Sequence, residues 1–464
     1  MRMHPSSVRT VRALSLVLLS AVAACQSSPP LASTATPPSA PPRPTPAAAS
    51  RLNPLVPADS LQGVGIQIWH PWLGVEASLL ESQIAKFNQM NEWGITARAM
   101  GHSSFTELHS DISGSLTGSE GPQLAIALPE HAIEWDASGH VVDLDKYVAD
   151  PIYGLESGEV SDFPAVFWNQ DVVAGKRLGV PAQRSARLVL YNKAWARELG
   201  FEDAPVTDED FREQACAAHT ALQRDEDPAN DGQGGWIVDT HSMTMLSWMI
   251  AFGGGVLDGS GYRFLSPKNL EAVAFLKQLY DDACAWLPQT SGDKAPAFAA
   301  RGALFAAGGL EELSEFSRAL AAAENPDEWT VLNFPGPDQP GLVAYGSSFV
   351  VFKGAPEQQL ASWLFIRWML SAENQKEWVE ATGLFPLRAS MVDQLAAYSR
   401  SHPQWDAAVQ LVPSAQIQPQ LASWRMVRVM LGDGFDAMFR SNTPSGRVAE
   451  ILAIMDRTAS DLVK

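Results

Sequence analysis

Carboxylates, histidines and cysteines most often carry chemistry, and in this 464-residue sequence they form no established catalytic motif. The sequence has no G-x-S-x-G nucleophile elbow, no H-E-x-x-H zinc pair and no G-x-x-x-x-G-K-[ST] phosphate loop. Adjacent carboxylates at Asp281-Asp282 and Glu311-Glu312 could serve as the two acids of a carbohydrate-cleaving enzyme. Acidic neighbours are also common on helix surfaces in a chain with 52 acidic and 33 basic residues. We therefore interpret both pairs as parts of solvated helix surfaces and not as a hydrolytic site.

A second acidic cluster lies in the stretch "RDEDPANDGQGG", residues 224–235. Its oxygen ligands precede a glycine, as in calcium-binding loops, and they are Asp225, Asp227, Asn230 and Asp231. The order of an EF-hand is absent, because no Glu stands at the twelfth position and Pro228 interrupts the loop. We therefore expect a solvated acidic turn and no bound metal, with a calcium site as the weaker alternative.

Cys25 ends the stretch "SAVAACQSSPP", which follows three arginines and an apolar run at 13–24. This layout is typical of an export signal, and 12 apolar residues are fewer than the roughly 20 that span a bilayer. Residues 22–25 resemble a bacterial lipobox, which implies a lipoprotein signal peptide at 1–25 and acylation of Cys25. The alternative is an ordinary cleaved signal with an incidental cysteine.

Residues 26–60 are rich in Pro, Ser, Ala and Thr and carry almost no charge, which predicts an extended tether. We expect the membrane to be contacted through the lipid anchor alone, because no apolar stretch after residue 25 is long enough to span it. The formal net charge of −19 argues against a nucleic-acid partner, since such binding relies on Lys and Arg neutralising phosphates.

Two further cysteines, Cys216 and Cys284, complete the set of three. In an exported protein such a pair can form a disulfide. The bond would close a loop of about 69 residues. In the chain-entropy treatment, it would raise the free energy of unfolding by about 4 kcal/mol. Two independent buried thiols are an equally good interpretation.

Strand and helix patterns alternate along the rest of the chain. Val64, Ile66 and Ile68 alternate as in a strand, and Leu80, Ile84 and Phe87 follow at helical spacing. The stretch 205–222 begins with a capping-box pattern from Thr207 to Asp210 and continues as a helix. Gly383 and Pro386 end a helix that starts after Ser371. This alternation predicts an α/β protein with mostly parallel sheets.

Three stretches in order resemble the bacterial extracellular solute-binding proteins of family 1, which serve ABC importers for sugars and related solutes. They are "IQIWHPWLGVEASLLESQIAKFNQMN", "LGVPAQRSARLVLYNKAWARELGF" and "YGSSFVVFKGAPEQQLASWLFIRWMLSAENQKEWVEATGLFPLR". The resemblance implies two lobes joined by a hinge around a central ligand cleft. It places lobe 1 at 61–180 plus 346–383 and lobe 2 at 181–345 plus 386–464. Ligand contacts to both lobes would stabilise the closed form.

The cleft is expected where strands end and where the chain crosses between lobes. Residues that follow strands and face this cleft are Trp72, Glu130 and His131, with Glu130 as a hydroxyl-binding carboxylate or, equally, an exposed acid at a helix start. Polar contacts at the crossings are expected from Gln183, Arg184, Ser185, Tyr345, Gly346, Ser347, Ser348 and Arg388. The resemblance to maltose-binding-like members implies that Trp424 stacks on a sugar ring.

Three positions depart from the family pattern. Leu310 stands where maltose-type members have a second stacking Trp, Gln420 where glycerol-phosphate-type members have a phosphate-binding Arg, and Leu384 where they have a tyrosine. A sugar is therefore favoured over glycerol 3-phosphate. The expectation is a monomeric, lipid-anchored, extracytoplasmic receptor without cofactor or catalysis that delivers a mono- or oligosaccharide to an ABC permease. The alternatives are another polar solute in the same fold and, less favoured, a secreted carbohydrate-active enzyme.

Overall fold

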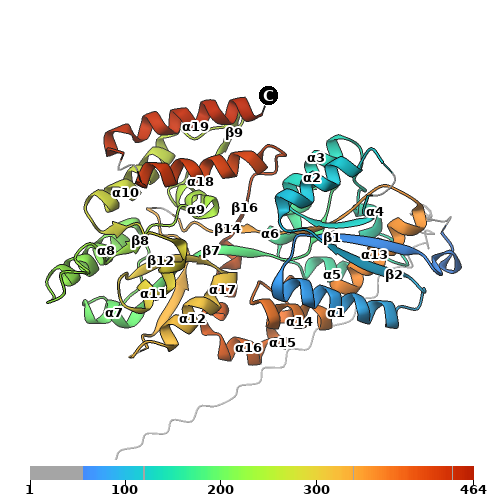
Figure 1. Ribbon diagram of the computed structural model, residues 1–464, viewed down its shortest axis with the longest axis horizontal. Coiled ribbons are helices and arrows are strands. Elements are labelled where there is room, and N and C mark those ends of the chain that lie inside the picture. Colours follow the sequence, from blue (N-terminus) through green and yellow to red (C-terminus); the bar gives the residue numbers. More distant parts are fainter. Residues whose placement is uncertain (1–55, 119–120, 325, 338, 441–442, 464) are drawn as a thin grey trace, which may run out of the picture. The chain divides into compact units, whose positions relative to one another are not determined.

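The computed structural model describes residues 56–463, except 119–120, 325, 338 and 441–442. Cys25, the predicted signal segment and nearly all of the predicted tether lie outside the described residues. The described chain folds into two α/β lobes, each with its own sheet (Figure 1). The expected two-lobe α/β fold is confirmed. None of the helices in this part of the chain is long and apolar enough to cross a membrane.

The sheet of the first lobe has five strands in the order β2-β1-β3-β15-β6. Their bounds are β1 Gly65–His70, β2 Thr96–Gly101, β3 Leu124–Ala127, β6 Val180–Pro181 and β15 Ser348–Val351. The helices of this lobe are α1 Gly74–Met90, α2 Phe105–Ser115, α3 Pro129–Ala137, α4 Asp145–Val148, α5 Ser157–Ser161, α6 Ala165–Trp168, α13 Pro356–Met369 and α14 Ala372–Thr382. Ile66 and Ile68 of β1 are buried, as are Leu80, Ile84 and Phe87 of α1, so the predicted strand and helix face are confirmed.

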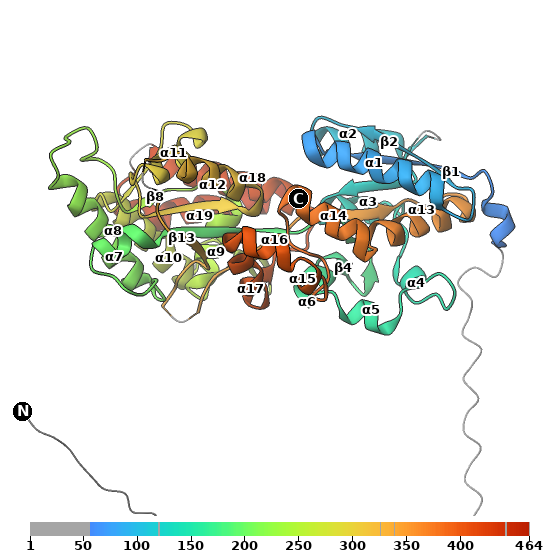
Figure 2. The ribbon, with the colours of Figure 1, turned by 90° about the horizontal axis from the view of Figure 1, so that it is seen from below.

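The sheet of the second lobe has seven strands in the order β11-β8-β12-β7-β14-β16, with β13 also paired to β7. Their bounds are β7 Ser185–Asn192, β8 Trp236–Ile237, β11 Ala285–Trp286, β12 Phe305–Gly309, β13 Trp329–Leu332, β14 Val343–Tyr345 and β16 Gln416–Ile417. Its helices are α7 Lys193–Glu198, α8 Asp208–Gln223, α9 Ser242–Ala251, α10 Pro267–Asp281, α11 Lys294–Ala299, α12 Leu313–Ala321, α15 Met391–Gln394, α16 Ala396–Ser401, α17 Pro403–Leu411, α18 Trp424–Arg440 and α19 Val448–Leu462. α18 and α19 lie side by side on this lobe (Figures 1 and 2).

Short elements complete the fold. Two small hairpins are formed by β4 Val172–Val173 with β5 Lys176–Arg177 and by β9 Leu257–Asp258 with β10 Gly261–Tyr262. The 3-10 turns are η1 Ala58–Leu61, η2 Asn169–Asp171, η3 Ser291–Asp293, η4 Leu310–Glu312, η5 Val412–Ser414 and η6 Ser445–Arg447.

The prediction of mostly parallel sheets is wrong, because both sheets are mixed. In the first lobe, β15 pairs antiparallel with β3 and β6. In the second lobe, the longest strand, β7, pairs antiparallel with β12, β13 and β14. β7 begins directly after the chain leaves the first lobe, and β14 ends directly before the chain returns there. The two strands must therefore run in opposite directions, a constraint that helix and strand periodicity alone does not contain.

The chain crosses between the lobes at three places. It passes from β6 to β7 over residues 182–184, from β14 to β15 over residues 346–347, and from α14 toward α15 after Thr382. Gly383 ends α14 in the left-handed conformation with φ of 71°, as its position predicts. The stretch "LVAYGSSFVVF" thus forms two strands that belong to different sheets.

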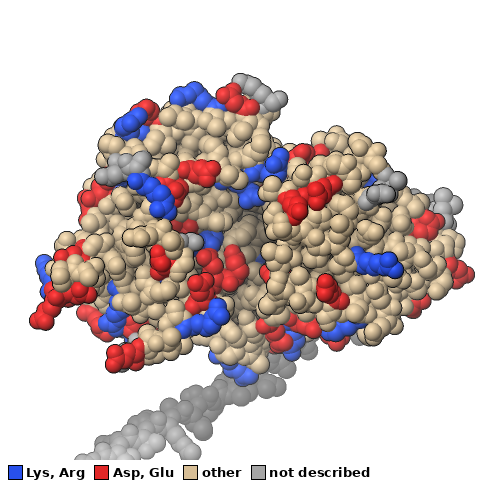
Figure 3. Space-filling view, in the orientation of Figure 1, with Lys and Arg blue, Asp and Glu red and all other residues tan. Residues whose placement is uncertain are grey.

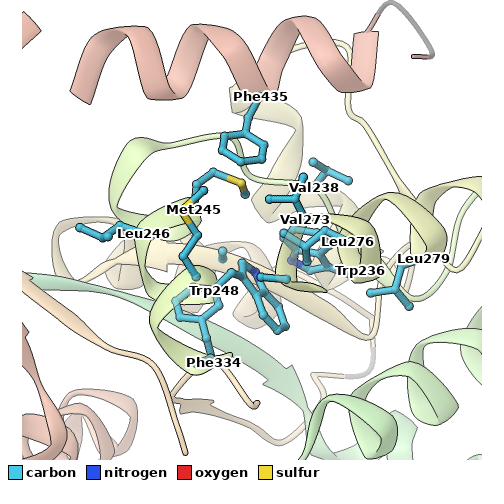
Figure 4. Packing of buried hydrophobic residues seen from close by; sticks show 14 of the residues in the cluster. Trp236, Val238, Met245, Leu246, Trp248, Val273, Leu276, Leu279, Phe334 and Phe435 are labelled. Atoms are coloured by element: carbon cyan, nitrogen blue, oxygen red, sulfur yellow. The ribbon is translucent and has the colours of Figure 1, made fainter. Parts of the chain in front are cut away.

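The core of the second lobe gathers aromatic side chains between the sheet and its helices (Figure 4). Trp236 of β8 and Trp248 of α9 lie edge to face with ring centroids 5.8 Å apart, and Phe334 packs on Trp248 at 5.3 Å. Beside this core, Cys216 of α8 and Cys284 before β11 are joined by a disulfide, with Cα atoms 4.5 Å apart. The bond ties a helix to an edge strand of the sheet.

Candidate functional site

A hollow lies between the two lobes, and acidic side chains are exposed on its second-lobe wall (Figure 3). The sheet topology builds this wall. Tyr345 at the end of β14 is in register with Ser185 at the start of β7, and Gly309 at the end of β12 is in register with Arg187. One end of the strands therefore brings together the end of β12, the end of β14 and the start of β7, next to the crossings.

Glu311 follows β12 at this end of the strands, next to the crossings. It stands in η4, directly after β12, and its side chain is exposed. Ser185 Oγ donates a hydrogen bond to Glu311 Oε2 at 2.7 Å, and Tyr345 Oη donates to Oε1 at 3.0 Å. Burial and the charge of Glu311 hold the pKa of Tyr345 well above its usual value, so the phenol stays protonated and donates. The three side chains form a compact hydrogen-bonded group, which we call the Glu311 cluster.

A buried ionic network lies behind the Glu311 cluster. Arg187 pairs with both Asp239 and Glu312, and Lys294 lies 3.2 Å from Glu312 and 3.6 Å from Asp239. Burial raises the pKa of Asp239, but Arg187 and Lys294 outweigh it and lower the value to about 2. The backbone N–H of Gly309 donates to Glu312 Oε2 at 2.8 Å. The network, with two cations and two carboxylates, therefore holds η4 in place and is balanced in charge.

His241 lies beside the cluster, with its ring centroid 6.1 Å from that of Tyr345. Burial and the charge of Arg187 lower the pKa of His241 to about 4, so the imidazole is neutral at pH 7. Its Nδ1 accepts the Met243 N–H at 3.2 Å and caps α9. His241 thus adds an uncharged aromatic face to the wall.

Arg184 is buried at the crossings, which corrects the expectation that its side chain is open to a ligand. Its side chain is fully buried and pairs with Asp171 at 2.8 Å. It also donates to the carbonyl oxygens of Ser347 and Phe167 and to Ser348 Oγ. These bonds join the first and second crossings to each other.

The second crossing packs directly on the first. Gly346 has φ of 154°, and an added Cβ would lie 2.1 Å from the carbonyl oxygen of Gln183. The carbonyl of Ser347 accepts the N–H groups of Ala182 and Gln183, while Ser347 Oγ is buried without a partner in the described residues. Gly346 is therefore required by close backbone approach to the neighbouring crossing.

Gly346→Ala is expected to lower the free energy of unfolding by roughly 2 kcal/mol or more, because the backbone conformation and the Gln183 carbonyl both oppose a Cβ. Urea unfolding monitored by tryptophan fluorescence measures this loss. Gly158→Ala on α5, where a Cβ meets nothing within 4 Å, is the matched control and should change stability by less than about 1 kcal/mol. Equal free energies of unfolding in the two variants would contradict the claim that close backbone approach at Gly346 excludes a Cβ.

Glu130 and His131 lie where α3 of the first lobe meets α18 of the second. Glu130 is 2% exposed, and Arg428 donates to its Oε1 at 3.0 Å, while Oε2 has no partner in the described residues. Arg425 of α18 lies 3.7 Å from Glu134. His131 is buried and lines a largely apolar pocket of about 810 Å³ between α3, α18 and α19. Glu130 thus bridges the lobes with its carboxylate occupied by an arginine.

Glu130→Gln is expected to leave the free energy of unfolding at pH 7 unchanged or to raise it by up to about 1 kcal/mol. Burial raises the pKa of Glu130, although Arg428 opposes this shift. A carboxyl whose pKa is raised by folding costs stability when ionised, and the cost disappears as the pH falls through that pKa. Urea unfolding measures the free energy of unfolding of both proteins at pH 7 and pH 4. Any excess stability of the variant at pH 7 should vanish at pH 4. A loss above 1 kcal/mol at pH 7 would contradict this.

Trp72, which was expected to face the cleft, and Trp424, which was expected to stack on a sugar ring, both pack in the lobe cores, which corrects both expectations. Trp72 is buried against Trp378 of α14, with ring centroids 4.6 Å apart. Trp424 is fully buried in the second-lobe core, and its Nε1 donates to Gln418 Oε1 at 3.2 Å. Trp72 lies in the loop between β1 and α1, whereas Trp424 is the first residue of α18.

The remaining candidates lie outside the Glu311 cluster. Arg388 pairs with Glu159 of α5 at 3.3 Å and covers the Phe163 ring at 5.0 Å. Gln183 is half-buried at the crossing. Gln420 Nε2 donates to three carbonyls at 169, 170 and 172, whereas Leu310 and Leu384 are buried.

The acidic loop at 225–231 bonds to itself. Asp225 accepts from the Asp227 N–H at 2.7 Å and from Asn230 Nδ2 at 2.9 Å, and Asp227 accepts from the Ala229 N–H. Within residues 56–463, apart from the undescribed gaps, no group of three His, Cys, Asp or Glu side chains could hold a metal. These bonds are those of a solvated acidic turn.

The family model described as "Bacterial extracellular solute-binding protein" matches residues 82–412, most of the chain. The chain belongs to this family. Membership places the solute-binding protein outside the cytoplasm. No curated protein matched its sequence.

Solved structures share the fold. The sugar-binding protein MalE from Xanthomonas citri has a TM-score of 0.72 at 19% identity, covering 86% of this chain and 98% of its own. The cyclic alpha-maltosyl-1,6-maltose binding protein from Arthrobacter globiformis has 0.69 at 17%, covering 86% and 99%. UgpB from Mycobacterium tuberculosis, solved with glycerophosphocholine, has 0.68 at 19%, covering 86% and 98%. Structural similarity at such low sequence identity establishes the fold of the solute-binding protein but does not identify its solute.

Proposed function

We propose that this solute-binding protein captures a mono- or oligosaccharide between its lobes and delivers it to an ABC permease by closing around it. The Glu311 cluster carries the proposal. A carboxylate and two hydroxyls at the edge of a sheet, beside a hinge, suit the hydroxyl groups of a sugar. The solved relatives named for maltose or sugar binding support the same ligand class.

Closure supplies the signal to the permease. A ligand shifts the equilibrium between open and closed forms only through contacts that differ between them. A sugar held against the Glu311 cluster would gain first-lobe contacts only when the lobes approach, and the α3–α18 ion pairs would add to the closed form. We further propose that Cys25 is acylated after export and that residues 26–60 hold a monomeric receptor clear of the membrane.

A thermal-shift screen against neutral mono- and oligosaccharides tests the proposal. A ligand present at 100 times its Kd should stabilise the protein by about 2.7 kcal/mol. sn-Glycerol 3-phosphate belongs in the same screen, because UgpB was solved with a phosphodiester. Stabilisation by the phosphate alone, or by nothing in the panel, would contradict sugar capture.

Incubation with oligosaccharides separates the receptor from an enzyme. The adjacent carboxylates Glu311 and Glu312 do not share a site, because Glu312 is held by Arg187 and Lys294 whereas Glu311 bonds to hydroxyls. We therefore expect no new reducing ends. Turnover that is lost in Glu311→Gln would overturn the receptor proposal.

A further inference from the structure

The cations around the cleft are already committed to carboxylates. Arg184 pairs with Asp171, Arg388 with Glu159, Arg428 with Glu130, and Arg425 with Glu134 at 3.7 Å. Arg187 and Lys294 are shared between Asp239 and Glu312. An anionic solute would have to break one of these pairs to find a counter-charge. The wall is therefore poorly suited to a phosphate or carboxylate ligand.

Glu311 is the exception to this balance. Its two oxygens accept hydrogen bonds from Ser185 and Tyr345, and no Lys or Arg of the described residues forms an ion pair with it. Hydroxyl donors leave the carboxylate with its full negative charge. The net charge of the whole chain, −19, adds to the negative potential around it.

The geometry of the cluster also fixes the kind of hydrogen bond that a ligand must make. Ser185 is buried, and its hydroxyl proton is directed at Glu311, as is the proton of Tyr345. Only oxygen lone pairs remain free on these three side chains. A ligand group that donates and does not accept matches them best, and an ammonium group has three donors and no acceptor.

Two aromatic rings lie at or beside the cluster. The rings of Tyr345 and His241 lie 6.1 Å apart, and the neutral state of His241 at pH 7 removes the repulsion that an imidazolium would cause. Cations are attracted to the faces of such rings.

We propose that the Glu311 cluster binds the ammonium group of an amino sugar, so that the receptor prefers 2-amino-2-deoxy sugars to their neutral counterparts. This inference rests on the proposed function and specifies its substrate class. Glu311 supplies the counter-charge, and Ser185 and Tyr345 orient it.

Matched ligand pairs test the inference by isothermal titration calorimetry on the full chain. The pairs are glucose with glucosamine, galactose with galactosamine, mannose with mannosamine, and cellobiose with chitobiose. The members of each pair differ only in hydroxyl or amine at C2 of each ring. For a pair that binds, the amine should bind about tenfold more tightly at low salt, and added NaCl should reduce the preference.

Two variants locate the effect. Glu311→Gln keeps the size and one acceptor oxygen but removes the charge, and should abolish the tenfold preference for the amine over its neutral counterpart. Glu315→Gln, an exposed acid four residues on in α12, is the matched control and should keep the preference. Thermal unfolding of both variants checks that each remains folded.

The outcomes separate the two proposals. Neutral sugars that bind as well as their amines, or a preference retained in Glu311→Gln, would overturn the amine inference and leave sugar capture standing. If no member of any pair binds, the inference fails, and if the wider neutral panel also fails, sugar capture fails with it.

Discussion

Arg187→Met is expected to lower the free energy of unfolding by about 3–5 kcal/mol at pH 7 and to abolish solute binding. Arg187 is buried and pairs with Asp239 and Glu312. Its removal leaves two carboxylates that share Lys294 alone, and breaking a buried pair costs this much because the remaining charge has lost its partner. Movement of Glu312 would also release η4 and displace Glu311. Urea unfolding and calorimetric titration measure the two effects.

The pH dependence of this loss has a defined sign. In the native protein the pKa of Asp239 is lowered to about 2, so its charge stabilises the fold above an unfolded pKa of about 3.9, and this contribution is lost as the pH falls toward 2. Without Arg187, burial is opposed by Lys294 alone and the pKa of Asp239 rises. Protonation then relieves the buried charge, so the deficit of the variant should be largest at pH 7 and smaller at pH 4.

Two further variants test the cause. Arg187→Met combined with Asp239→Asn removes the buried charge together with its partner and should recover part of the stability. Arg197→Met breaks an exposed pair with Glu328 and should cost less than about 1 kcal/mol. The role of the network would be contradicted if Arg187→Met lost no more free energy of unfolding than Arg197→Met. It would also be contradicted if the loss in Arg187→Met grew as the pH falls.

Local signals in the sequence predict elements well where neighbours along the chain decide the structure. The capping box from Thr207 to Asp210 begins α8, and Gly383 ends α14. The strand direction in the second lobe was missed because it depends on the crossings, which join residues more than a hundred positions apart. Local periodicity contains no such information.

In the candidate site, too, local sequence signals predict some residues, whereas contacts between distant parts of the chain decide the others. Ser185 and Tyr345 were predicted, and they meet at Glu311. Glu311 follows a buried strand, the same signal that singled out Glu130, but its position beside Glu312 suggested a solvated acidic face. The predictions for Trp72 and Trp424 are wrong because a tryptophan in a loop before a helix, or at its first residue, can turn to the cleft or to the core. Which way it turns depends on partners such as Trp378 and Gln418 that sequence spacing does not identify.

Replacing Cys216 and Cys284 together by Ala is expected to lower the free energy of unfolding by about 4 kcal/mol. The bond closes a loop with a sequence separation of 68 residues, and its removal returns that loop's freedom to the unfolded chain. The native state should change little, because α8 and the start of β11 remain packed in the same core. Solute affinity should therefore stay within about twofold while the urea midpoint falls.

The oxidised protein with and without a reductant provides the control for this comparison. Reduction of the native chain should reproduce the instability of the double variant, whereas the variant itself should not respond to the reductant. If the native chain and the variant unfold at the same urea concentration under oxidising conditions, the two sulfurs are independent thiols and the loop is not closed in the protein. A lower affinity without a loss of stability would instead mean that the bond positions the binding wall. The topology argues against this: β11 and β12 both run parallel to β8, and Cys284 precedes β11 whereas Glu311 follows β12, so the two residues lie at opposite ends of the strands.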